Sequence, residues 1–304
     1  MDLPLEHLST FAAIVEEGSF EGAARRLHIT PSAVSQRVKA MEQRVGSVLL
    51  QRTRPVEVTA AGATILRMAR QLGRLLDDAA AELGSGPSGG TAIPLVVNAD
   101  SLATWFVPAL ARAARETGAR FEVLRADETI STERLRRGEV MAAVTATKDP
   151  VPGCTSTRLG IDRYYAVAAP DFFAQYFATG VNADTLHRAP MMEFDRHDQF
   201  QQRFIRRVTR ARISPERHLI PSSAEFVRAI ELGLGWGMVP ELQCVDPIRE
   251  GRLVALGTGP SAGPGLDPGS AIEMPLYWQR WNLNSPVLDQ LSAVIAEEAA
   301  AALH

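Results

Sequence analysis

One stretch, ITPSAVSQRVKAMEQRVGSVLLQR at residues 29–52, constrains the fold of this chain more than any other. Thr30 is of a type that caps helices, and Pro31 follows it at the first helical position, where a missing N–H costs nothing. Projected at about 100° per residue, the helix that begins there separates apolar from polar side chains. The apolar side holds Val34, Val38, Met41 and Val45, and the polar side holds Ser32, Ser35, Gln36 and Lys39. The polar face therefore carries short hydrogen-bonding groups and few acids, unlike a generic solvated face.

The flanking segments predict a small domain of short helices with a two-strand tail. An apolar helical period begins at Leu5 and closes at Gly18, and Ser19 can cap the next helix. The four residues LHIT separate that second helix from the one that starts after Thr30. The pieces LLQR and VEVT then predict a hairpin. This order predicts a winged helix-turn-helix, a motif whose second helix fits the major groove of double-stranded DNA.

Positive charge is concentrated in the same segment. Between residues 25 and 54 there are seven basic residues and a single acid, Glu42, so the segment carries a net charge of +6 against −3 for the whole chain. That concentration predicts contact with DNA phosphates, and arginines at the hairpin tip can enter a minor groove. A small helical domain with a solvated basic face is the alternative, which the agreement of cap, turn, helix face and hairpin disfavours. The predicted DNA-binding residues are Thr30, Ser32, Ser35, Gln36, Arg37, Lys39, Arg52 and Arg54.

A long amphipathic helix follows the hairpin. Its apolar residues alternate steps of four and three, which is the seam of a coiled coil. They are Ile65, Ala69, Leu72, Leu76, Ala79 and Leu83. The loop sequence GSGPSGG comes directly afterwards and frees the helix from the rest of the chain. Dimerisation through this seam is favoured over the alternative, in which the helix packs only on its own chain.

From about Ile93 onward, the sequence predicts an α/β domain. Buried-strand patterns such as PLVVNADS, VMAAVTAT and GWGMVP alternate with helical patterns such as LATWFVPALARAARE and AEFVRAIELG. Alternation of this kind indicates a parallel sheet covered by helices.

Composition and motifs argue against several classes of protein. The two cysteines, Cys154 and Cys244, lie far apart and predict neither a disulfide framework nor a zinc site. The six histidines show no metal-ligand spacing, and no nucleophile elbow or phosphate-binding loop is present. No basic start with an apolar stretch marks a secretory signal, and no apolar run could cross a bilayer. We therefore expect a cytoplasmic protein without catalytic residues, metal or cofactor.

The N-terminal pattern also resembles a known family. FAAIVEEGSFEGAARRLHITPSAVSQRVKAMEQRVGSVLLQRT and the later VEVTAAG are similar to the DNA-binding domain of LysR-type transcriptional regulators, and the likeness covers the whole chain. NADSLATW, ERLRRGEV and LYWQRW further resemble the ArgP/LysG branch, which senses basic amino acids. The resemblance implies an activator of lysine or arginine export or metabolism genes. It also implies a homodimer that assembles as a homotetramer on DNA, with RNA polymerase as a further partner.

The same resemblance implies the domain organisation. Residues 1–62 would form the winged helix-turn-helix, and residues 63–90 the linker and dimerisation helix with its hinge. Residues 91–304 would form a two-lobed effector domain similar to periplasmic binding proteins. Lobe I would comprise about 91–166 and 271–304, and lobe II about 167–270. The chain would cross between the lobes near Tyr164–Ala168 and Ser270–Pro275.

An effector would bind between such lobes, at helix starts and strand ends. Ser101 can cap one helix, and SSAE at 222–225 is a capping-box pattern for another, so both starts offer N–H groups to a carboxylate. Each of these residues has an alternative role. The serines can be ordinary helix caps, and the acids at strand ends can be solvent-exposed surface residues. Trp105 can belong to the hydrophobic core. Resemblance to the basic-amino-acid branch implies L-lysine or L-arginine as effector. Among the acids, it favours Asp127, Glu128 and Asp195 as partners of the effector's positive charge. The predicted effector residues are Ser101, Thr104, Trp105, Asp127, Glu128, Asp195, Ser222 and Ser223.

Two other functions stay open on the sequence. The first is an architectural or replication-initiation-inhibiting DNA binder without effector control, which would need no ligand site. The second is a small-molecule enzyme built on the α/β domain, which the lack of a nucleophile, metal or cofactor motif disfavours.

Overall fold

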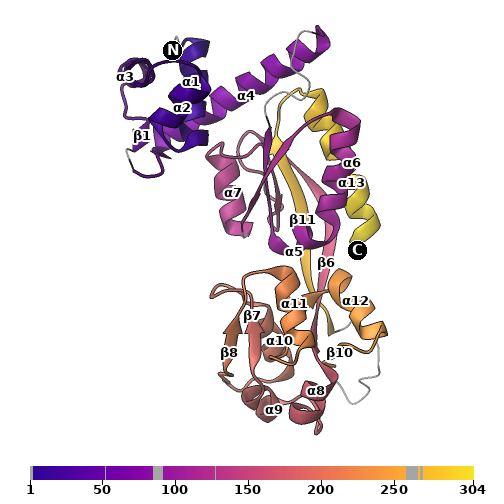
Figure 1. Cartoon of the computed structure of the whole chain (residues 1–304). Coiled ribbons are helices and arrows are strands. Elements are labelled where there is room, and N and C mark those ends of the chain that lie inside the picture. Colours follow the sequence, from indigo (N-terminus) through magenta and orange to yellow (C-terminus); the bar gives the residue numbers. More distant parts are fainter. Residues whose placement is uncertain (1–2, 52, 85–91, 127, 258–265, 268–269) are drawn as a thin grey trace. The chain divides into compact units, whose positions relative to one another are not determined.

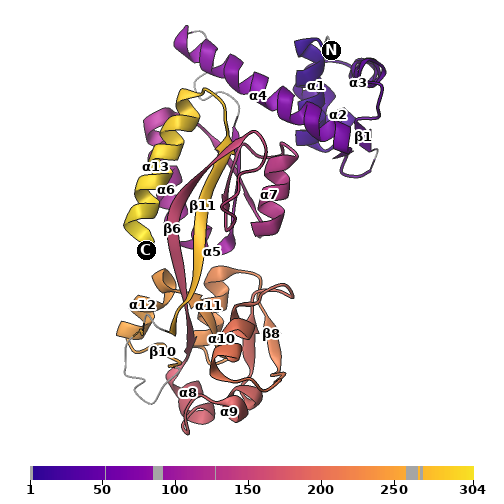
Figure 2. The same ribbon diagram turned by 180° about the vertical axis from the view of Figure 1, so that it is seen from behind.

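A computed structural model describes residues 3–51, 53–84, 92–126, 128–257, 266–267 and 270–304, without the side chains of residues 128 and 129 (Figures 1 and 2). The chain forms two compact units. One comprises Met1–Val97, Leu110–Thr157 and Trp278–Ile295, and the other comprises Asn98–Ala109, Arg158–Tyr277 and Ala296–His304.

The N-terminal part of the first unit is the predicted winged helix-turn-helix. Its elements are α1 (Leu5–Glu17), α2 (Phe20–Arg26), α3 (Pro31–Val45), β1 (Leu50–Gln51), β2 (Glu57–Val58) and α4 (Ala60–Glu82). The predicted caps are confirmed, since Ser19 Oγ accepts from Gly22 N at 3.0 Å and Thr30 Oγ1 accepts from Ala33 N at 3.2 Å. Gly18 ends α1 in the left-handed region, and β1 and β2 pair antiparallel.

The core of this domain takes one side of each helix. Phe11, Ile14, Val34 and Met41 are fully buried there, together with Leu49 at the start of the hairpin. The start of α4 crosses the hairpin so closely that a Cβ on Gly62 would lie 1.9 Å from the Leu49 carbonyl oxygen. Only glycine fits at this crossing.

The apolar seam of the long helix α4 divides into a covered and an uncovered half. Ile65 and Ala69 of the predicted seam are buried against the domain core. Further along, the Leu76 side chain is 44% exposed and Leu83 is 79% exposed. Packing on the same chain therefore accounts for the first half of the seam and leaves the second half uncovered within the described residues.

The sheet of the C-terminal region is mixed, not parallel as the alternation predicted. Its order is β10-β6-β11-β5-β3-β4, with β9 also paired to β6. The strand β3 is parallel to β4 and β5, whereas β6 is antiparallel to β9 and β10. The bounds are β3 (Ile93–Val97), β4 (Phe121–Arg125), β5 (Ala142–Thr145), β6 (Cys154–Ala168), β9 (Gly237–Pro240), β10 (Val254–Ala255) and β11 (Ile272–Trp281). The short strands β7 (Met191–Glu193) and β8 (Arg217–Leu219) form a separate parallel pair.

Helices join these strands. They are α5 (Ala99–Ser101), the π-helical turn η1 (Leu102–Phe106), α6 (Val107–Thr117), α7 (Glu128–Arg136), α8 (Pro170–Tyr176), α9 (Ala183–Arg188), α10 (Phe200–Val208), α11 (Ser223–Glu231), α12 (Glu241–Arg249) and α13 (Pro286–Ala302). Among the described residues, no helix is both long and apolar enough to cross a membrane.

Of two predicted caps in this region, the first is wrong and the second is confirmed in its position but not in its hydrogen bond. The first helix after β3 begins at Ala99 with Asn98 at its cap position, so Ser101 lies inside it. Ser222 does occupy the cap position of α11, but its hydroxyl bonds the Glu225 carboxylate instead of a backbone N–H. Strand ends and polar residue types indicate where such helices start. The hydrogen-bond partner of a serine hydroxyl, in contrast, depends on a rotamer that tertiary packing sets.

Candidate functional site

The helix α3 presents the predicted polar face to solvent. Val34, Val38 and Met41 are buried, while Ser32, Ser35, Gln36 and Lys39 are exposed. Two of the hydroxyls are occupied locally, since Ser32 Oγ lies 2.9 Å from Thr30 Oγ1 and Ser35 Oγ donates to the Pro31 carbonyl at 3.0 Å. This leaves Gln36 and Lys39 as the long polar side chains of the face that bond no other described residue.

Part of the predicted positive charge is neutralised within the domain. Arg37 donates to Glu6 Oε2 at 2.7 Å and to Thr10 Oγ1 at 3.0 Å, which ties α3 to α1. Arg26 pairs with Glu16 at 2.5 Å and with Glu17 at 3.5 Å. These acids precede residue 25, so the charge counted over residues 25–54 overstates the field available to DNA. Contact of Arg37 with DNA stays a prediction.

The hairpin that follows α3 is held to it by Glu42, whose carboxylate accepts from Leu49 N at 2.9 Å. Arg54 is exposed beyond β1. Arg52 lies outside the described residues.

In the second unit, a half-buried carboxylate joins three elements. Asp100 of α5 accepts from Tyr164 Oη on β6 at 2.8 Å and from Ser223 Oγ at the start of α11 at 2.6 Å. Tyr164 is buried and stacks on Phe200 with ring centroids 4.1 Å apart. Burial raises the pKa of Asp100, and these two hydrogen bonds work in the opposite direction.

Two further carboxylates lie beside Asp100, Asp162 buried and Asp198 half-buried. Asp162 is 3% exposed, and burial together with the charge of Asp100 raises its pKa to about 7. Asp198 accepts from the backbone N–H groups of Phe194 and Phe200 at 2.9 and 3.0 Å, and burial raises its pKa. Within the described part of the chain, no lysine or arginine forms an ion pair with any of these three acids. Desolvated negative charge of this kind favours a cation from outside.

Several polar atoms in the same segment lack a partner. Asn98 Oδ1, Ser101 Oγ and Trp105 Nε1 are buried and make no hydrogen bond to the described residues. The residues that carry these atoms lie close to Asp100 in the chain. Buried polar atoms in folded proteins normally have a hydrogen-bond partner.

The structure brings together only some of the predicted effector residues. Ser223 donates a hydrogen bond to Asp100, and Ser101 follows Asp100 in the chain. Thr104 Oγ1 instead donates to the backbone carbonyl of Asp100 at 2.7 Å, within the same helical segment. Asp195 accepts from His197 N at 2.6 Å and Asp198 N at 3.1 Å, so it shapes a turn. Asp127 and the side chain of Glu128 lie outside the described residues.

The sequence prediction missed Tyr164 and Asp162 and favoured other acids over Asp100. A signal was present in IDRYY, because an aspartate and a tyrosine two residues apart share one face of a strand. Their partners come from distant segments, which no local pattern could indicate.

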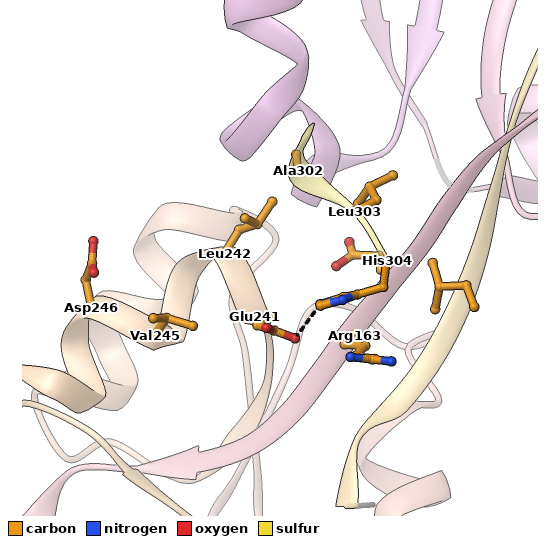
Figure 3. Close-up of a pocket in the computed structure, with 10 residues that line it drawn as sticks. Arg163, Glu241, Leu242, Val245, Asp246, Ala302, Leu303 and His304 are labelled. Carbon is orange, nitrogen blue, oxygen red and sulfur yellow. Dashed lines mark hydrogen bonds and ion pairs between the residues drawn. The ribbon is translucent and has the colours of Figure 1, made fainter. Parts of the chain in front are cut away.

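A cavity of about 260 Å³ lies beside Asp162 in the same unit. Figure 3 shows Glu241, Leu242 and Val245 of α12 on one side of it and Leu303 and His304 on the other. His304 Nε2 lies 3.0 Å from Glu241 Oε2, and the His304 backbone pairs with Ile161 on β6. Within the described residues, no group of His, Cys, Asp and Glu side chains is arranged to hold a metal ion.

Comparison with known proteins assigns the two parts of the chain. The family model described as a bacterial regulatory helix-turn-helix protein, LysR family, matches residues 5–63, and the LysR substrate binding domain matches residues 92–300. The chain belongs to the LysR family. It is a transcriptional regulator that binds DNA through its helix-turn-helix domain.

Relatives and solved structures agree over nearly the whole LysR-family chain. The lysine export transcriptional regulatory protein LysG of Corynebacterium glutamicum is 38% identical over 297 residues, covering 96% of both proteins. The crystal structure of ArgP from Mycobacterium tuberculosis matches with a TM-score of 0.82 at 38% identity, over 97% of this chain and 96% of that one. Full-length LysG of Corynebacterium glutamicum with bound effector arginine matches with a TM-score of 0.76 at 35% identity, over 97% and 98%.

Proposed function

We propose that this LysR-family regulator responds to L-lysine or L-arginine, bound beside Asp100, and controls a gene for export or metabolism of basic amino acids. The observation that carries the proposal is the group of carboxylates at Asp100, Asp162 and Asp198, of which Asp162 is buried and the other two are half-buried, and for which the described residues supply no cation. The arginine bound by the LysG relative and the lysine export in its name support the same effector class.

The effector's polar groups have partners of suitable chemistry around Asp100. Asp100 would accept from the effector's cation, and Ser101, Ser223 and Trp105 would bond its remaining polar groups. Asp127, Glu128 and Asp195 remain proposed on the resemblance of the sequence alone. Thr104 and Ser222 have local partners and would serve by holding the helix starts.

On DNA, we propose that Gln36 and Ser32 read base edges while Lys39 and the hairpin arginines contact phosphates. The uncovered seam of α4, at Leu76 and Leu83, would join two chains as a dimer, and two dimers would form a tetramer on DNA. RNA polymerase would be the partner at a promoter. Such a regulator would act in the cytoplasm and catalyse no reaction.

Calorimetric titration of the purified full-length protein with L-lysine, L-arginine and L-leucine tests the effector assignment. We expect saturable binding of a basic amino acid, one per chain, and no binding of leucine. If neither basic amino acid binds, the effector assignment is wrong, and a DNA binder without effector control becomes the better description.

A further inference from the structure

A second basic segment lies in the second unit, along α10 and the chain that leads from it to β8 (Figure 1). Residues 203–217 hold six arginines and a single acid, Glu216, so the segment carries a net charge of +5. The other residues of 91–304 hold 16 basic and 24 acidic side chains, a net charge of −8. Positive charge is thus concentrated in one short stretch of an otherwise acidic region.

The helix α10 turns apolar side chains inward and arginines outward. Phe204 and Ile205 are buried in the unit. The exposed arginines of the helix and of the chain that follows it, called the arginine face below, are Arg203, Arg206, Arg207, Arg210 and Arg212. At about 100° per residue, the three arginines on the helix fall on the side away from the buried residues. The charges therefore share one exposed surface.

The fold neutralises only part of this charge. Arg217 donates to Glu193 at 3.2 Å, and Arg207 donates to the Ala271 carbonyl at 2.6 Å, so both hold segments of the unit together. Within the described part of the chain, three side chains of the arginine face make no ion pair or hydrogen bond: Arg206, Arg210 and Arg212.

Helix stabilisation accounts for one of these three arginines at most. Arg206 lies in the last turn of α10, where a positive charge interacts favourably with the helix dipole. Arg210 and Arg212 lie beyond the end of the helix at Val208, so this effect does not explain them. Their charges stay available to a partner.

The composition of the arginine face favours a nucleic acid over a protein as that partner. Among residues 203–217, all of which the structure describes, no large apolar side chain is exposed. Protein–protein interfaces have an apolar centre, whereas interfaces with DNA are polar and strongly positive. Arginine also matches phosphate oxygens with paired N–H groups. The surface chemistry thus fits a phosphate backbone.

We propose that the arginine face binds the phosphate backbone of double-stranded DNA, as a second contact that does not read bases. The chain binds DNA through its helix-turn-helix domain, so a bound duplex is present at high local concentration for the rest of the same molecule. Phosphate contacts add affinity without sequence preference. The proposal does not depend on which effector the protein binds.

Salt dependence of binding to a long random-sequence duplex tests the proposal on the full-length protein. The test variant combines Arg206→Gln, Arg210→Gln and Arg212→Gln. Its slope of log Kobs against log salt concentration should be shallower than that of wild type by about 2 to 3, because each lost phosphate contact removes about 0.9. Thermal melting should match wild type, since the three side chains have no partner in the fold.

A second variant controls for net charge. Arg136→Gln, Arg137→Gln and Arg249→Gln together remove the same three charges from side chains that are more than half exposed and lie outside the arginine face. This control should keep the wild-type slope. An equal loss of slope in both triple variants would overturn the proposal, because the effect would then come from total charge.

Photo-crosslinking locates the contact without removing any arginine. The crosslinker p-benzoylphenylalanine, placed at the exposed Ser214 between the arginine face and β8, should crosslink the full-length protein to the duplex. The same group at Asp246 of α12, whose side chain is 65% exposed, should not. Equal salt slopes in wild type and the Arg206, Arg210 and Arg212 variant would overturn the proposal. If that variant does not fold, the crosslink decides, and its absence at Ser214 would overturn the proposal.

Discussion

At the scale of single residues, Asp100 links the effector chemistry to the fold. It lies on the first turn after β3, yet its carboxylate is fixed by Tyr164 of β6 and Ser223 of α11. A half-buried carboxylate held by two hydroxyls keeps lone pairs for a further donor. The residue is therefore oriented before a ligand arrives, which reduces the entropic cost of binding.

Asp100→Asn should weaken binding of L-lysine and L-arginine by about tenfold to a hundredfold, because a hydrogen bond to a charged acceptor is lost. The fold should survive, since the amide can still accept from Tyr164 or Ser223. Calorimetric Kd values for the variant, with Asp246→Asn as control, provide the measurement. Equal Kd values in wild type and Asp100→Asn would place the cation elsewhere.

The raised pKa of Asp162 also predicts how the free energy of unfolding depends on pH. Its pKa is about 7 in the folded protein and ordinarily about 3.8 in an unfolded chain, so the folded state holds an extra proton between these values. Wild-type stability should fall as pH rises through this window, whereas asparagine does not titrate. The free energy of unfolding of Asp162→Asn relative to wild type should thus increase from pH 5 to 7, by up to about 1.4 kcal/mol per unit. Urea unfolding at several pH values measures it, and a constant difference would contradict the raised pKa.

At the scale of elements, α3 shows what local sequence can and cannot predict. Its start at Pro31 and its buried face at Val34, Val38 and Met41 follow from capping and period, which are local properties. The ion pair of Arg37 does not follow from local properties, because Glu6 lies 31 residues earlier in the chain and contacts Arg37 only in the folded domain. The mixed order of the sheet escaped prediction for the same reason, since β6 and β11 are neighbours separated by more than a hundred residues.

The neighbouring residues Gln36 and Arg37 should respond differently to alanine. Gln36→Ala should leave thermal stability unchanged but cost about 1–3 kcal/mol of discrimination between specific and non-specific DNA. Arg37→Ala should lower the free energy of unfolding by about 1 kcal/mol, because Glu6 and Thr10 lose their partner. Thermal melts and competition binding on both variants separate the two effects. An unchanged specificity ratio for Gln36→Ala would count against base reading by α3.

The helix α4 offers a matched pair of glycines. Gly62→Ala should destabilise the DNA-binding domain by roughly 3 kcal/mol or more, because its Cβ would meet the Leu49 carbonyl at 1.9 Å. Gly73→Ala lies in the same helix with no atom within 4 Å of the added Cβ, so it should stabilise by about 0.5–1 kcal/mol. Denaturant unfolding of both variants checks the close crossing, and similar values for the two would refute it.

At the scale of the whole molecule, local charge departs from the net charge of −3. Residues 25–54 are strongly basic, although residues 1–62 as a whole hold seven basic and seven acidic residues, and Asp100 and Asp162 lie in the second unit. The order of the parts was predictable from the sequence, because helical period, the GSGPSGG linker and strand alternation change along the chain. The sequence did not predict how Asp100, Asp162 and Tyr164 lie relative to one another, since this depends on how distant strands and helices pack.

The central claim is that the carboxylates around Asp100 select a cationic effector, and comparison of L-arginine with L-citrulline tests it most directly. Citrulline keeps the shape of arginine and lacks the positive charge. Titration of the full-length protein should show saturable binding of arginine and at least about tenfold weaker binding of citrulline, as the loss of one charge-assisted hydrogen bond requires. Equal affinity for the two amino acids would show that the acids around Asp100 do not recognise a cation.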